Sequence, residues 1–119
     1  MMQAEAMAAG SPSAIDRGHL AHMTFGDRSL EQEVLRLFER QAALLIARMR
    51  GADASAVASL AHTLKGSATG IGAWDVARAA EAVELASGAG VVDCDDAIAR
   101  LSAAVDAAHA AIVELLHAA

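Results

Sequence analysis

Proline and aromatic residues are scarce in this 119-residue chain. Tyrosine is absent, aromatic residues make up 3% of the sequence, and the single proline is Pro12. Because proline breaks helices and alanine, which is abundant here, favours them most, little in the sequence prevents long helices. A chain of this length has room for one domain with one hydrophobic core. The sequence therefore predicts a single all-α domain.

Cysteine, clustered basic residues and long apolar runs are also scarce, and each absence argues against a class of protein. Cys94 stands alone, which excludes an internal disulfide and fits a reducing, cytoplasmic location. The net charge of −6, with no run of Lys or Arg, argues against binding to nucleic acid. No stretch reaches about 18 uncharged apolar residues, so no membrane span is expected. Residues 1–14 lack the basic start of a signal peptide and are expected to form a flexible leader.

The spacing of apolar residues predicts a short helix and four longer ones within residues 15–119. We expect helices over residues 16–23, 28–50, 54–70 and 73–87, and a last helix that begins after 93–96. The connections are short, so neighbouring helices are expected to be antiparallel. The predicted fold is an antiparallel up-down four-helix bundle with a short additional N-terminal helix.

The helix expected over 28–50 has a wide apolar stripe, and spacing alone does not decide which of its apolar residues are exposed. Asp27 or Ser29 can cap its start, and Ser29 with Gln32 has the form of a capping box. One row of the stripe contains Leu30, Val34, Leu37, Gln41 and Leu44, and a second row contains Leu35, Phe38, Ala42, Leu45 and Met49.

The helix expected over 54–70 contains the most informative residues. If Val57 and Leu64 face the core, His62 lies more than about 90° away around the helix and faces solvent. Lys65, three residues later, is a neighbour of His62 on the helix surface. A glycine inside a helix costs about 1 kcal/mol relative to alanine, and close approach of another protein is one reason to keep Gly66 there. The pattern predicts an exposed imidazole beside a cation, with a clear approach path.

A carboxylate is expected at the same level of the neighbouring helix. The turn near Gly72 follows His62 by ten residues, which is about 15 Å of helix. Returning by a similar distance along the antiparallel helix leads to Glu84. A hydrogen bond from Nδ1–H to this carboxylate would fix the tautomer and leave Nε2 unprotonated and nucleophilic. This orienting role is like that of the acidic member of a hydrolytic triad.

The segment His62-Thr63-Leu64-Lys65-Gly66-Ser67-Ala68, followed by Ile71-Gly72-Ala73 and then by Glu84, resembles the phosphoacceptor signature of histidine phosphotransfer (Hpt) domains. The likeness covers residues 20–116, and its specific part is residues 61–84. It implies a relay protein of two-component phosphorelays.

The resemblance also implies a role for each residue of the signature. His62 would accept the phosphoryl group on Nε2, Lys65 would offset its negative charge, and Gly66 would let a receiver domain dock closely. Glu84 would hold the imidazole, and Ser67 would hydrogen-bond Glu84 in turn. The expected partners are response-regulator receiver domains and a hybrid histidine kinase.

By the same resemblance, the receiver domain supplies the acceptor Asp and the Mg²⁺. The chain is therefore expected to bind no cofactor or metal of its own. It has no Gly-rich nucleotide loop and no room for an ATP-binding domain, so it is expected to be a phosphocarrier and not an autonomous kinase. One histidine and one docking face suffice for a relay, and a monomer is expected.

Two other functions are compatible with a helical bundle. An adaptor would bind a receiver or a kinase without being phosphorylated, and replacing His62 would not affect that binding. A metal-binding bundle would need inward-facing Glu and His pairs on several helices, and the apolar stripes contain almost none. His19 and His22 lie three residues apart, but no further ligands are expected to converge on them.

Overall fold

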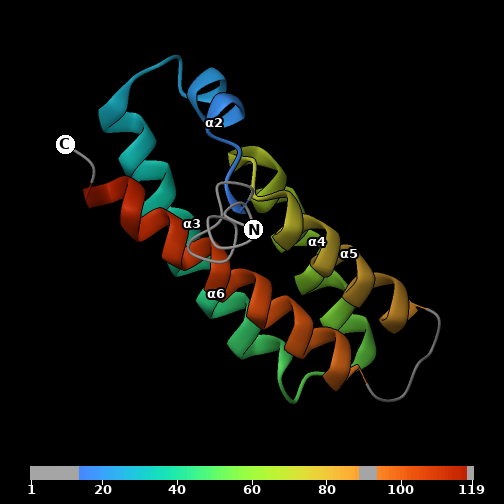
Figure 1. Cartoon of the computed structure of the whole chain (residues 1–119). Helices are drawn as coiled ribbons and strands as arrows, with labels where there is room; N and C mark the ends of the chain where they lie inside the picture. Colours follow the sequence, from blue (N-terminus) through green and yellow to red (C-terminus); the bar gives the residue numbers. More distant parts are fainter. Residues whose placement is uncertain (1–13, 89–93, 118–119) are drawn as a thin grey trace, which may run out of the picture.

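The computed structural model describes residues 14–88 and 94–117, and this part of the chain is built from helices (Figure 1). A short helix, α2 (Arg17–Met23), precedes the four long helices α3 (Arg28–Met49), α4 (Ala54–Ile71), α5 (Trp74–Gly88) and α6 (Asp95–His117). Among the four long helices, neighbours in sequence pack side by side and α3 also contacts α6, while α2 packs against α4. The predicted four-helix bundle with a short additional helix is confirmed.

The expected flexible leader, residues 1–14, lies outside the described residues except for Ala14. Ala14 is buried, with 5% of its surface exposed, and belongs to the core together with Ile15. Packed structure therefore begins at least one residue earlier than the boundary drawn from the sequence.

Aspartate side chains cap the starts of α3 and α4. Asp27 accepts a hydrogen bond from the Leu30 amide at the start of α3, so of the two caps considered for this helix Asp27 is the one used. Asp53 accepts a hydrogen bond from the Ala56 amide and starts α4 in the same way. Each carboxylate pairs a backbone N–H that has no partner within its helix, which fixes where the helix begins.

The two apolar rows of α3 have different environments. The second row, which sequence spacing treats as an extension of the first, is the one that faces the core. Leu37 and Leu44 of the first row are 55% and 50% exposed. Helical spacing alone does not show which row is buried. The contacts with α4 and α6 decide it, because these helices cover the side of α3 that carries Leu35, Phe38, Ala42, Leu45, Ile46 and Met49.

Asp16 fastens the N-terminal segment to the turn between α4 and α5. Its amide donates to the Gly72 carbonyl (2.9 Å), and its carboxylate accepts hydrogen bonds from the His19 amide and from Trp74 Nε1, each at 3.0 Å. These donors, the His19 amide foremost, lower the pKa of Asp16 below its ordinary value. The contact places α2 across the end of the α4–α5 pair, as Figure 1 shows.

Gly72 makes this turn possible. Its φ of 79° is left-handed, and a Cβ built on it would lie 2.9 Å from Asp16 Cβ. The Gly72 and Ala73 amides bond back to the last turn of α4, which closes the helix end and starts α5 directly afterwards.

We expect Gly72→Ala to lower the free energy of unfolding by at least about 1–2 kcal/mol, since it adds left-handed strain and a clash with Asp16. Gly70→Ala is the matched control, because Gly70 is helical and its Cβ position is open. It should be neutral or stabilise by up to about 1 kcal/mol. Urea denaturation measures both values. Equal stability of Gly72→Ala and the wild type would show that this turn does not hold the segment.

Candidate functional site

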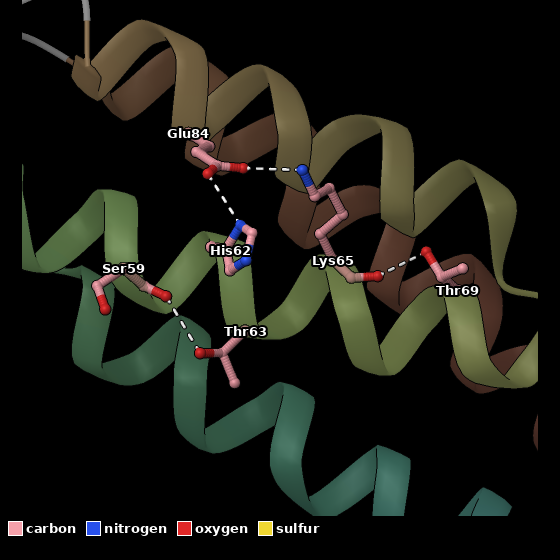
Figure 2. A network of polar contacts seen from close by, with 6 residues as sticks. All are labelled: Ser59, His62, Thr63, Lys65, Thr69 and Glu84. Atoms are coloured by element: carbon pink, nitrogen blue, oxygen red, sulfur yellow. Dashed lines mark hydrogen bonds and ion pairs between the residues drawn. The ribbon is translucent and has the colours of Figure 1, made fainter.

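His62 lies on the outer side of α4, as the helical spacing predicts. Its side chain is 66% exposed, whereas Ala61 and Leu64 on the same helix are fully buried. His62 Nδ1 is 3.0 Å from Glu84 Oε2 on α5, so the carboxylate expected at this level is present (Figure 2). A carboxylate can only accept a hydrogen bond, and Nδ1 must therefore carry the proton. In the neutral imidazole this leaves the lone pair on Nε2.

Glu84 binds two partners at once. Its second oxygen, Oε1, is 3.1 Å from Lys65 Nζ, so one carboxylate connects the imidazole and the ammonium group (Figure 2). Lys65, and after it His62, lowers the pKa of Glu84 and keeps this group ionised at neutral pH. The side chains of Lys65 and Glu84 are only 31% and 29% exposed, whereas His62 projects further into solvent.

Small residues lie next to His62 on the outer side of α4. Gly66 lies one turn further along α4, is exposed, and has no neighbouring atom within 4 Å of a Cβ built on it. Thr63 and Thr69 donate their hydroxyls to carbonyls of their own helix, those of Ser59 and Lys65, and so hold these groups close to the helix (Figure 2). The protein's own packing therefore does not explain the missing side chain at Gly66, and the approach to Nε2 is open.

Ser67 does not make the hydrogen bond to Glu84 that the resemblance implies. Its hydroxyl donates to Gln41 Oε1 on α3, at 2.8 Å. The reason is the helical repeat: five residues after His62, Ser67 is turned by about 140° and faces α3, while Glu84 approaches from α5 on the other side. Ser67 thus connects α4 to α3 and does not support Glu84.

Sequence reasoning did not identify Gln41 as a residue that contacts the site. It belongs to the first row of α3, between the exposed Leu37 and Leu44, and it binds Ser67 of α4. The sequence did contain one signal for it, since Gln41 is the one polar side chain in an otherwise apolar row. Its partner could not be identified before the side of α3 that faces solvent was known.

A second histidine has a similar carboxylate contact on another face of the bundle. His109 Nδ1 of α6 contacts Glu39 Oε2 of α3, and the His109 side chain is 62% exposed. No cation pairs with Glu39 as Lys65 pairs with Glu84 among the contacts of the described residues, and Asp106 lies three residues before His109. His109 therefore serves as a comparison for His62 within the same protein. The two side chains are similarly exposed and each contacts a glutamate, but the further charged residue is the acidic Asp106 near His109 and the basic Lys65 near His62.

Neither a metal centre nor a membrane span is seen in the described part of the chain. Residues 14–88 and 94–117 contain no group of three or more His, Cys, Asp or Glu that could hold a metal ion. His19, considered with His22 as a possible ligand pair, instead has its Nε2 3.1 Å from the Thr69 carbonyl. None of the helices in these residues combines the length and hydropathy that crossing a membrane requires.

Comparison with known protein families finds a match to most of the chain. The profile of the Hpt domain family matches residues 29–111, from the first turn of α3 into the second half of α6. The matched part contains His62, Lys65, Gly66, Ser67 and Glu84, and leaves out α2. No curated protein and no solved structure matches the chain at a significant level.

We expect His62 in Glu84→Ala to populate both neutral tautomers, since no other acceptor for Nδ1–H is present among the described contacts of this ring. Long-range ¹H–¹⁵N spectra at a pH where His62 is neutral should show the Nδ1–H form in the wild type and a mixture in the variant. Glu84→Gln keeps an acceptor and should keep the Nδ1–H form. His109 should be unchanged in both variants. An unchanged His62 spectrum in Glu84→Ala would contradict the orienting role.

Proposed function

Because the chain belongs to the Hpt domain family, whose members are phosphocarriers in two-component phosphorelays, we propose that His62 is its phosphoacceptor. In this proposal Nε2 takes a phosphoryl group from the receiver domain of a hybrid histidine kinase and passes it to a response regulator. The supporting observation is the contact of one Glu84 carboxylate with both His62 Nδ1 and Lys65 Nζ.

The chemistry needs little more than a positioned nucleophile and balanced charge. The Nε2 lone pair attacks the phosphorus of an aspartyl phosphate, the bond from phosphorus to the aspartate oxygen breaks, and the carboxylate leaves. The ring keeps its Nδ1 proton and gains positive charge, which the Glu84 carboxylate stabilises. Lys65, next to the ring, offsets the charge of the incoming phosphoryl oxygens.

We expect the partner to supply the remaining components. The receiver domain carries the aspartate, and the Mg²⁺ that neutralises the phosphoryl oxygens is held on its side. This division of labour requires no nucleotide or metal on the present chain. One imidazole and one docking face carry out the reaction, so a monomer suffices.

The docking face in this proposal consists of the outer side of α4 and the first row of α3. Gly66 leaves room beside His62, and Leu37 and Leu44 expose large apolar side chains on the adjacent helix. Exposed apolar side chains of this size mark an interaction surface when they gather on one face. We refer to this surface, defined by His62, Gly66, Leu37 and Leu44, as the docking face.

A transfer assay with phosphorylated receiver domains and Mg²⁺ tests His62 directly. The wild type should acquire acid-labile, alkali-stable phosphate, and His62→Gln should acquire none. His109→Gln is the matched control, because His109 has similar exposure and a similar carboxylate contact. It should be labelled like the wild type.

Two results would contradict the proposal. Labelling that survives in His62→Gln would place the phosphoryl group on another residue. Equal receiver binding by both proteins without labelling of either would support an adaptor in place of a carrier.

Gly66→Ala tests the close approach of the partner. The added methyl lies in open space, so the free energy of unfolding should stay equal or rise by about 1 kcal/mol. Receiver-dependent transfer should slow about tenfold, since a methyl forced into a packed interface costs about 1–3 kcal/mol. Labelling by phosphoramidate, a small donor that needs no docking, should be unchanged. Equal loss with both donors would show that the methyl disturbs His62 itself and not docking.

A further inference from the structure

Phe25 is the least expected residue in the described part of the chain. It lies in the turn between α2 and α3, 90% exposed, with a left-handed φ of 57°. It is the one non-glycine residue with positive φ in residues 14–88 and 94–117. For a bulky side chain such a φ is a true outlier and costs about 1–2 kcal/mol.

The turn is held in this conformation by its own hydrogen bonds. The Thr24 hydroxyl donates to the Leu20 carbonyl (2.8 Å), the Gly26 amide to the Ala21 carbonyl (2.9 Å), and the Asp27 amide to the Thr24 carbonyl (2.9 Å). The backbone is therefore fixed, and the Phe25 side chain is directed into solvent. Within the described part of the chain it makes no packing contact that would offset the energetic cost of the left-handed backbone. Glycine at this position would adopt the same φ without this cost, and so would make the isolated chain more stable.

An apolar pocket lies next to this turn. Its volume is about 250 Å³, and its walls come from α2, the first turns of α3 and the end of α4. Met23, on its rim, is itself 49% exposed. The lining residues are Leu20, Met23, Thr24, Leu30, Val34, Gly70 and Ile71.

The pocket lies along the same two helices, α3 and α4, as the docking face. Gly70, in its wall, follows Gly66 by one helical turn and His62 by two, a distance of about 12 Å along α4. Val34, in the opposite wall, lies three residues before Leu37 in the same row of α3. One partner of ordinary size, burying about 800 Å² on each side, can span both.

We infer that Phe25 and the adjacent pocket are an anchoring site for the receiver domain that docks at His62. Phe25 inserts into an apolar depression of that partner, and an apolar side chain of the partner fills the pocket. The inference rests on the proposed function for the partner's identity. It goes beyond the family match, because residues 29–111 include neither α2 nor Phe25. The anchor would distinguish one receiver from another while His62 carries out the chemistry.

Phe25→Gly separates this role from folding. Glycine relieves the left-handed strain, and the side chain it removes is 90% exposed, so thermal stability should not fall. The receiver that exchanges phosphoryl groups fastest with the wild type serves as the probe. The receiver concentration for half-maximal transfer should rise about 10- to 100-fold, which is what burial of an aromatic side chain contributes. Phe25→Leu keeps apolar bulk and should restore most of the loss.

Two further readouts distinguish failure of the anchor from failure of the proposed function. Phosphoramidate should label His62 equally in the wild type and Phe25→Gly. Binding of the same receiver, measured by calorimetry in a His62→Gln background, should weaken by the same factor as transfer, and this holds whether or not His62 is the acceptor. Unchanged receiver binding in Phe25→Gly would overturn the inference. So would sedimentation showing that Phe25 holds two copies of this chain together.

Discussion

The Glu84 carboxylate is the group around which the site is organised. It accepts from His62 Nδ1 at 3.0 Å and pairs with Lys65 Nζ at 3.1 Å, and so it fixes the tautomer of His62 and the position of the Lys65 ammonium group together. Both contacts cross from α5 to α4. They exist only if the two helices keep their register to within a fraction of a turn.

The fold keeps this register by a tight turn and by small side chains. Gly72 and Ala73 alone separate α4 from α5, and Asp16 binds this turn from outside. The interface between α4 and α5 is the most extensive in the bundle. Alanines in it let the two backbones approach closely, so a glutamate side chain reaches the imidazole of the neighbouring helix. The buried alanines of the two helices are Ala61, Ala68, Ala77 and Ala80.

Sequence reasoning was most successful where the geometry is local. The level of Glu84 followed from counting residues through a short turn, and the exposure of His62 followed from one helical wheel. It was least successful where the environment of a side chain depends on a third helix. The partner of Ser67 is Gln41, because α3 covers that side of α4, and the exposure of Leu37 and Leu44 depends on which row of α3 meets its neighbours. The strained backbone of Phe25 has no signature in composition or spacing.

The central claim is that Glu84 leaves Nε2, and not Nδ1, of His62 as the nucleophile. The most direct test is to label the ¹⁵N-enriched protein with phosphoramidate and to identify the ring nitrogen attached to phosphorus by ³¹P–¹⁵N correlation. We predict a single signal, on Nε2 of His62, with Nδ1 still protonated. A phosphoryl group on Nδ1 of His62, or on His109, would contradict the account.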